Sequence, residues 1–224
     1  MPRKLGKFKR GRRTKMMRNF KIRALVFGGM LAVFWALGFY RGEANAAIKK
    51  VVVHIGYSTK SSYNYRQDTT WIKGWNSKDK GCGWVVIASA RSYTRGGISP
   101  KTLWTNLGKA GKVTLSRLNQ GLGNSDFVSY AKKAGLSVSG VGSSSTSIAK
   151  ALINHKVVAL HGSGHWIMTY GGYVNAYKDT STGKLKPVSV RSFCIEDPGH
   201  KKNRGKCFSA SSISKWTNTA YALR

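Results

Sequence analysis

The chain has 224 residues, enough for one domain of ordinary size once a targeting segment is set aside. Hydrophobic residues make up 41% and aromatic residues 11%, a composition typical of a globular protein with a packed core. The formal net charge of +32 predicts binding to polyanions. No zinc-finger, ribonucleoprotein or helix-turn-helix signature accompanies that charge, so specific nucleic-acid recognition is not expected.

The N-terminal region has the order of a secretory signal. Residues 1–23 hold eleven Lys or Arg and no acid, an uncharged apolar run follows over 24–40, and small residues lead to a predicted cleavage after Ala46. The alternative is a retained membrane anchor, because 17 apolar residues are at the lower limit for crossing a bilayer. In both cases we expect residues 1–46 to be the basic head and signal, and 47–224 to be a secreted or envelope-associated, extracytoplasmic domain.

The expected domain remains strongly cationic. Residues 47–224 hold 27 of the 39 basic and 6 of the 7 acidic residues, for a net charge of +21. Anionic wall polymers and lipid headgroups are the candidate partners outside a bacterium, while a solvated basic surface is the alternative. Apart from these headgroups, membrane contact is expected only through residues 24–40, if they are not removed.

The predicted elements begin with short extended pieces and loops over residues 47–80. The apolar run from Trp84 to Ala90 predicts a buried helix, although its β-branched residues would also suit a strand. Further helices are predicted from capping and apolar spacing: one starting at Ser99-Pro100, one capped by Ser125 and ended by Gly135, and one over 146–154 with Ile148, Leu152 and Ile153 facing inward.

The second half of the chain changes to strand patterns. We expect strands over 157–161 and 165–170, followed by a turn over 180–183. A third strand is predicted over 188–196, with Val188, Val190 and Cys194 on one face. A helical turn over 211–216 and a last strand over 220–223 complete the chain. Helices first and antiparallel strands later predict an α+β fold.

The three cysteines are Cys82, Cys194 and Cys207. Cys194 and Cys207 are close in sequence and could form a disulfide in an oxidising compartment, or Cys194 could be an unpaired core residue. Pairing would leave Cys82 as a free thiol. No cofactor is expected, because three cysteines without C-x-x-C spacing do not form a zinc site.

Cys82 has the setting that a thiol nucleophile needs. It lies between two glycines at the start of the predicted buried helix, where the helix dipole and free N–H groups stabilise a thiolate. His165 and His161 are both candidate bases on the predicted strands, and local pattern does not separate them. Asp197 ends the following strand, so antiparallel pairing would bring it beside the His165 imidazole as the orienting partner.

Four ordered motifs carry a family resemblance. They are residues 65–71 (YRQDTTW), 80–83 (KGCG), 164–173 (GHWIMTYGGY) and 195–199 (IEDPG). Over roughly residues 57–223 the chain resembles bacterial papain-fold cysteine peptidases related to bacteriocin-processing, double-glycine leader peptidases, in their secreted, peptidase C39-like branch. The first motif has one residue fewer between Gln and Asp than that family.

The resemblance implies a papain-like fold with the nucleophile at a helix start, packed on a C-terminal antiparallel sheet. It implies that Gln67 supplies a donor of the oxyanion hole, and it favours His165 over His161. Trp84 departs from the family, which has proline after Gly-Cys-Gly, and a tryptophan there would reshape or block the pocket. The implied activity is amide cleavage by thiol acyl transfer on a secreted or cell-wall peptide. The alternatives are a peptidoglycan hydrolase of NlpC or CHAP type and a catalytically silent basic binding module.

Overall fold

A computed structural model of the protein describes residues 48–224, in which all the strands join one sheet. The strands are β1 (Ile48–Gly56), β2 (Val138–Val141), β3 (Val157–Gly162), β4 (His165–Asp179), β5 (Leu185–Glu196), β6 (Cys207–Ser209) and β7 (Thr219–Leu223). The helices are α2 (Ser77–Lys80), α3 (Cys82–Arg95), α4 (Pro100–Gly108), α5 (Leu115–Asn119), α6 (Asn124–Lys133), α7 (Ser145–Ile153) and α8 (Ala210–Trp216), with 3-10 turns η1 (Ser61–Tyr63) and η2 (Lys201–Asn203).

The expected signal segment, with its apolar run and cleavage position, lies outside the described residues. Among the helices within 48–224, none is long and apolar enough to cross a bilayer.

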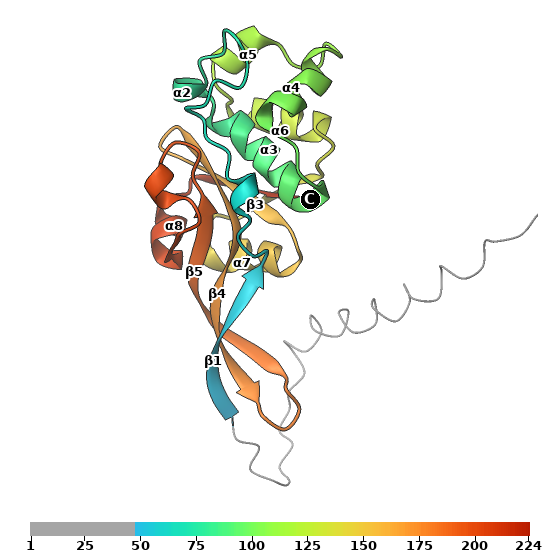
Figure 1. The fold of residues 1–224 in the computed structure, drawn as a ribbon. Helices are drawn as coiled ribbons and strands as arrows, with labels where there is room; N and C mark the ends of the chain where they lie inside the picture. Colours follow the sequence, from blue (N-terminus) through green and yellow to red (C-terminus); the bar gives the residue numbers. More distant parts are fainter. Residues whose placement is uncertain (1–47) are drawn as a thin grey trace, which may run out of the picture. The chain divides into compact units, whose positions relative to one another are not determined.

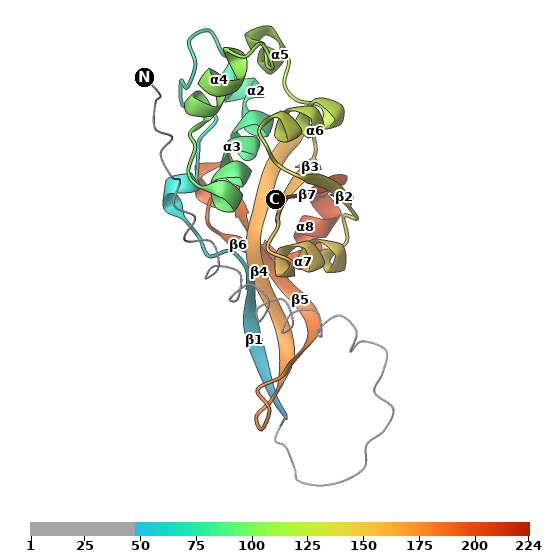
Figure 2. The ribbon, with the colours of Figure 1, turned by 90° about the vertical axis from the view of Figure 1, so that its right-hand side faces the viewer.

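The central strand of the sheet is β4. The strand order is β2-β7-β3-β4-β5-β6, and β1 pairs with the far half of β4. One edge of β4 therefore pairs with β3 near its start and with β1 towards its end, while β5 runs antiparallel along the other edge. Helices α2 to α6 form one group, and α7 and α8 lie along the strands away from it (Figures 1 and 2). This arrangement confirms the α+β class.

Two apolar cores lie on opposite faces of the sheet. Alternate residues of β3 divide between them: Val157 and Ala159 pack with α3, α4 and α6, whereas Val158 and Leu160 pack with α7 and α8. All four side chains have no exposed surface. Because both faces of β3 are covered, its sequence is a continuous apolar run rather than an alternating one.

Three local predictions are wrong. Helix α6 begins at Asn124 after Gly123, so Ser125 lies inside the helix and does not cap it. Ile153 is 47% exposed, because it lies five residues after the buried Ile148 and has turned off the apolar face of α7. Val188 is 55% exposed, because register shifts along the β4–β5 pair break the alternation that would place it beside Val190.

The β4–β5 hairpin is much longer than the sequence pattern predicts. Both strands continue to a turn between Asp179 and Leu185, and β1 pairs with the outer part of β4 over this extension. Figures 1 and 2 show the three strands extending past the helices. We call this extension the ribbon, defined as residues 48–54, 173–179 and 185–192.

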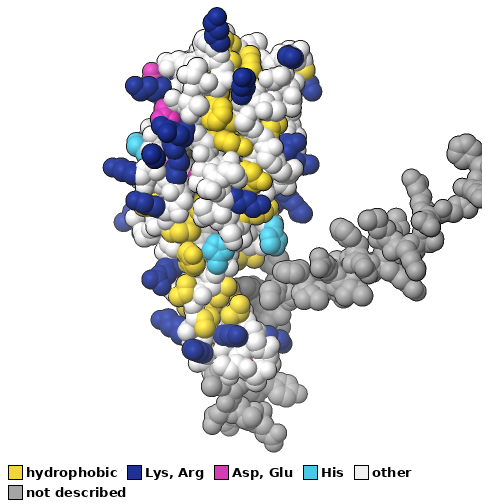
Figure 3. Space-filling view, in the orientation of Figure 1, with side chains coloured by type: hydrophobic (Ala, Val, Ile, Leu, Met, Phe, Trp, Pro, Cys, Tyr) yellow, Lys and Arg dark blue, Asp and Glu magenta, His cyan; other side chains and the backbone are white. Residues whose placement is uncertain are grey.

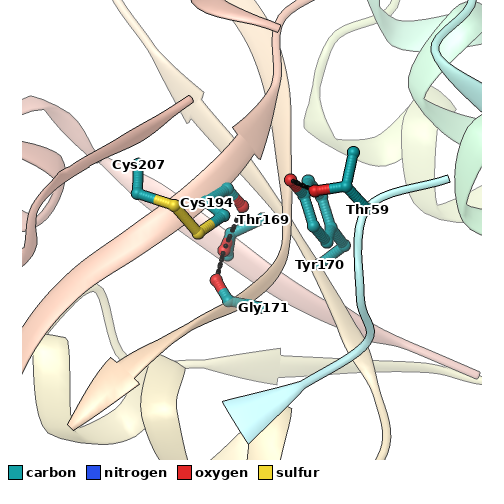
Figure 4. Close-up of a disulfide and its surroundings, with 6 residues drawn as sticks. All are labelled: Thr59, Thr169, Tyr170, Gly171, Cys194 and Cys207. Atoms are coloured by element: carbon teal, nitrogen blue, oxygen red, sulfur yellow. Dashed lines mark hydrogen bonds between the residues drawn. A yellow bond between two sulfur atoms is a disulfide. The ribbon is translucent and has the colours of Figure 1, made fainter. Parts of the chain in front are cut away.

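A disulfide joins the short edge strand β6 to β5. Cys194 and Cys207 are register partners in the β5–β6 pair and are bonded through their sulfurs (Figure 4). Next to it, the Thr169 hydroxyl lies 3.1 Å from the Gly171 carbonyl and 3.0 Å from the Cys194 carbonyl, where the β4–β5 register shifts. The disulfide thus holds the end of β5 three residues before Asp197.

We expect Cys194→Ala/Cys207→Ala to lower the free energy of unfolding by about 3 kcal/mol, because a closed loop of this length restricts the unfolded chain. Urea unfolding of the full chain followed by tryptophan fluorescence measures this. Reduction of the wild-type protein should give the same shift, and reductant should leave the double variant unchanged. Equal stability of oxidised and reduced wild-type protein would contradict the assignment.

Candidate active site

Cys82 begins α3, the most buried helix of the described chain. Side chains from Trp84 to Ala90 along α3 are nearly all fully buried, so the start of the helix is fixed in place. No side chain caps this helix, which leaves its first N–H groups and the positive end of its dipole at the cysteine. Cys82 is partly buried and is the free cysteine of the chain.

A tight turn places His165 opposite that cysteine. Gly162 and His165 are register partners, so β3 and β4 are joined by the two residues Ser163 and Gly164. Both have positive φ, 50° and 72°, as the turns that suit the twist of a two-residue hairpin require. His165 is therefore fixed at the first position of a long, buried strand rather than on a loop.

Strand β4 packs against the first turn of α3. A β-carbon on Gly83 would lie 3.0 Å from Leu122 and 3.1 Å from the Trp166 ring, so any other residue would press on both neighbours at this close approach. The His165 side chain and the Trp166 backbone N–H then lie beside the Cys82 sulfur, where both lower the pKa of the thiol. His165 and its neighbour thus both contact the thiol.

Asp197 holds the other side of the imidazole. Nε2 of His165 lies 2.9 Å from Oδ1 of Asp197, which leaves Nδ1 as the ring nitrogen that can serve Cys82. The carboxylate is only 4% exposed and accepts further bonds from the backbone N–H groups of Gly199 and His200 and from Asn203. This local turn gives the aspartate a fixed direction.

The charges of the three groups support one another. Burial raises the pKa of the Cys82 thiol, but the hydrogen bonds and positive charge of His165 bring it below its usual value. Burial lowers the pKa of His165, but its bonds to Asp197 and Cys82 raise it to about 9. Burial raises the pKa of Asp197, but its donors hold it well below the usual range. Both shifts favour a thiolate–imidazolium pair over the neutral thiol and imidazole.

Gln67 borders the same site. Its backbone N–H donates to the Pro198 carbonyl at 3.2 Å, and its side-chain Nε2 donates to the Lys78 carbonyl at 2.6 Å. A β-carbon on Gly199 would lie 3.5 Å from the Gln67 carboxamide carbon and 3.4 Å from Nε2 of His165. One amide hydrogen of Gln67 stays available, because the Lys78 carbonyl takes only the other.

The remaining sequence candidates lie apart from this group. His161, the rival base, stacks on Trp166 with ring centroids 4.4 Å apart, and burial lowers its pKa. Trp84 does not narrow the site as expected: it is fully buried among the helices, and its indole N–H donates to the Pro100 carbonyl at 3.1 Å. The bulky residue after Gly83 is thus a core residue.

Three residues of the site were not singled out by sequence reasoning. His200 bonds Asp197 through Nδ1, Asn203 bonds it through its amide, and Arg204 donates to the carbonyls of Asp197 and Pro198. The signal was an aspartate followed by Pro-Gly, a sequence that turns the chain back towards its own carboxylate.

His165, Asp197 and His200 are also the described residues best placed to hold a metal ion, because their ligand atoms lie within 4.8 Å of one another. A metal there would take Nε2 of His165 away from Asp197, so metal binding and proton transfer by this imidazole are alternatives.

Glu196, next to Asp197, shows the opposite electrostatics. It is 3% exposed, its Oε1 lies 3.4 Å from the Tyr93 hydroxyl, and its Oε2 has no hydrogen-bond partner in residues 48–224. Burial raises its pKa to about 8, despite the Tyr93 bond and the charge of Arg204. The Asp197 carboxylate is thus charged because hydrogen-bond donors surround it, whereas the Glu196 carboxyl is neutral because it has few donors.

Comparisons with known proteins add little to this geometry. No protein-family model matches the chain, and no curated protein does. Among solved structures, it is similar to the crystal structure of the peptidase domain of Streptococcus ComA, a bifunctional ABC transporter involved in a quorum-sensing pathway. The two are 18% identical with a TM-score of 0.41, over 65% of this chain and 91% of that one. Similarity this low leaves the functional argument to the site itself.

We expect Cys82 to react with iodoacetamide at a lower pH than an ordinary thiol of pKa about 8.5 needs, because its thiolate forms at lower pH. Mass mapping of labelled full chain across a pH series measures this. His165→Ala should move the labelling curve up towards that of an ordinary thiol, whereas His161→Ala should leave it in place. Identical curves for wild type and His165→Ala would contradict the ion pair.

Glu196→Gln should stabilise the fold more at higher pH. The folded-state pKa of Glu196 is raised from 4.5 to about 8, so between these values the protein must take up a proton when it folds. The free energy of unfolding of the wild type therefore falls as pH rises from about 4.5 to about 8. The amide keeps the shape and needs no proton. The difference in urea midpoint between variant and wild type should therefore increase across this window. A constant difference would contradict a buried, protonated Glu196.

Proposed function

We propose that this protein is a papain-like cysteine peptidase with Cys82 as nucleophile, His165 as acid and base, and Asp197 as orienting residue. The observation that carries the proposal is the arrangement of Cys82, His165 and Asp197: the imidazole bonds Asp197 at 2.9 Å and lies beside the Cys82 thiol, whose pKa it lowers. Its members come from a helix start, a strand start and a strand end. A thiol on a free helix N-terminus beside a buried, carboxylate-held imidazole is the arrangement that nucleophilic acyl transfer needs.

The chemistry follows from the protonation states. The Cys82 thiolate attacks the carbonyl carbon of an amide, a C–S bond forms, and the oxygen becomes an anion. The free amide hydrogen of Gln67 and the Cys82 backbone N–H would donate to that oxyanion. His165, already protonated, then gives its proton to the leaving nitrogen as the C–N bond breaks. Water, deprotonated by His165, attacks the thioester and restores the Cys82 thiolate.

The substrate in this proposal is a secreted peptide or a cell-wall peptide, and the protein acts outside the cytoplasm. The signal pattern over residues 1–46 and the net charge of +21 on residues 47–224 support that location. The same charge favours substrates attached to anionic wall polymers, so a peptidoglycan stem peptide is the second candidate.

The test compares cleavage of a peptide mixture and of purified peptidoglycan by the full chain, with new N-termini mapped by mass spectrometry. Cys82→Ala and His165→Ala should abolish cleavage. Release of stem peptides alone would identify a wall hydrolase. Cleavage that persists in Cys82→Ala would overturn the proposal, and binding without any cleavage would favour a silent module.

Gln67→Ala should lower kcat/KM about 10²–10³-fold, the usual effect of losing one oxyanion donor. Steady-state kinetics on the best peptide measures this, with Gln120→Ala, an exposed glutamine at the end of α5, as the matched control. The iodoacetamide curve of Cys82 should be unchanged in Gln67→Ala, because Gln67 does not bond the thiol. Wild-type kinetics in Gln67→Ala would remove it from the mechanism.

A further inference from the structure

The ribbon carries nearly all the exposed large hydrophobic side chains of the described residues. Only Ile153, on α7, lies elsewhere. The ribbon members are Ile48, Val52, Tyr173, Tyr177, Leu185 and Val188. Figure 3 shows hydrophobic and basic side chains together over the lower part of the molecule, where the ribbon lies. Exposed apolar side chains gathered in one place mark an interaction surface.

The strand register intersperses these side chains with lysines. Lys50, Tyr177 and Lys186 are register partners in a row across the three strands, so they lie on one face with the tyrosine between the two lysines. On the opposite face, Lys49, Lys178 and Leu185 form the corresponding row. The end of the ribbon therefore exposes apolar groups and lysines on both faces. Such a two-sided surface suits insertion of the ribbon end into a layer that surrounds it, such as lipid headgroups, better than a flat partner that covers one face.

The end of the ribbon is strongly cationic. Five lysines lie within residues 48–50 and 177–186, and Asp179 is the one acid there. The Asp179 carboxylate accepts bonds from the backbone N–H groups of Ser181 and Thr182 and from the Ser181 hydroxyl, so it serves the turn. An anionic partner complements the lysines that remain.

Two features favour phospholipid over a soluble polyanion. Tyrosine beside lysine is typical of the membrane–water boundary, where the ring stays among the headgroups and the ammonium group extends to phosphate. The chain also enters the ribbon at its end: Ile48 follows the apolar run 24–40 by eight residues. Eight residues span at most about 28 Å, so for as long as that run stays attached, a bilayer holding it lies within reach of Ile48.

We propose that the end of the ribbon docks on an anionic phospholipid surface, with Ile48, Tyr177 and Leu185 among the headgroups and the surrounding lysines on their phosphates. This docking is independent of the peptidase chemistry, because no ribbon residue belongs to the Cys82–His165–Asp197 series.

The test is the rate of lysine acetylation in the full chain bound to vesicles, mapped by mass spectrometry. Because the labelling is read at each lysine, protection of the ribbon is compared with that of lysines elsewhere on the same chain. With vesicles containing phosphatidylglycerol, Lys50 and Lys186 should react several-fold more slowly than with phosphatidylcholine alone. Lys101 and Lys109, exposed on and just after α4, should react equally with both. Equal rates at the ribbon lysines in both vesicles would overturn the proposal.

Two pairs of variants separate charge from apolar contact. Lys50→Gln/Lys186→Gln should remove the protection of Lys49 and Lys178, whereas Lys101→Gln/Lys109→Gln, with the same change in charge, should not. Ile48→Ser/Leu185→Ser should weaken the protection of Lys50, whereas Ile153→Ser should not. Soluble poly(glycerol phosphate) could protect the ribbon lysines as well as the vesicles do, with no effect of Ile48→Ser/Leu185→Ser. That result would overturn the lipid proposal and identify an anionic wall polymer as the partner. Cleavage of a soluble peptide should be unchanged in all these variants, so the two proposals fail separately.

Discussion

The contact between His165 and Asp197 is the interaction on which the site depends. Without a buried, charged carboxylate on Nε2, burial would leave the imidazole neutral and the Cys82 thiol protonated, because desolvation disfavours the charged form of each. Asp197 stays charged because backbone N–H groups, Asn203 and two histidines surround it. The turn after β5 therefore determines the charge on a helix more than a hundred residues earlier in the sequence.

Because the charge of the site depends on the His165–Asp197 contact, the contacts that fix the two strands carrying these residues matter for it. Trp166, the residue after His165, stacks on Phe127 with centroids 3.9 Å apart, and its indole N–H donates to the Leu122 carbonyl at 2.7 Å. On the other strand, the disulfide and Arg204 hold the end of β5 and the turn that follows. Rotation of either strand would separate the imidazole from its carboxylate, so rigidity here preserves a charge state as well as a shape.

The sequence allowed prediction of Cys82, His165 and Asp197 as candidates, because glycines flank the cysteine at a helix start, the histidine begins an apolar strand, and the aspartate ends the next strand. It left His161 as a rival, since the stacking of His161 on Trp166 depends on which side chains share a strand face. Trp84 was misplaced for a related reason. Trp84 lies two residues after Cys82, and the helix turns it into the core. A sequence motif does not reveal this rotation. The ribbon was missed because its strands mix apolar, basic and neutral polar residues without a regular alternation.

Strand β4 has His165 at one end and the ribbon turn at the other. A strand rises about 3.3 Å per residue, so the fourteen steps from His165 to Asp179 separate the two ends by roughly 45 Å. Whatever the ribbon contacts, strand β4 keeps His165 and the neighbouring Cys82 at about this distance from it. A partner bound at the ribbon is thus too far from Cys82 to be cut there. Under the proposed function, the protein would act on chains that extend this far from the bound surface. The length of strand β4 would then determine how far a substrate must extend from the bound surface to reach the site.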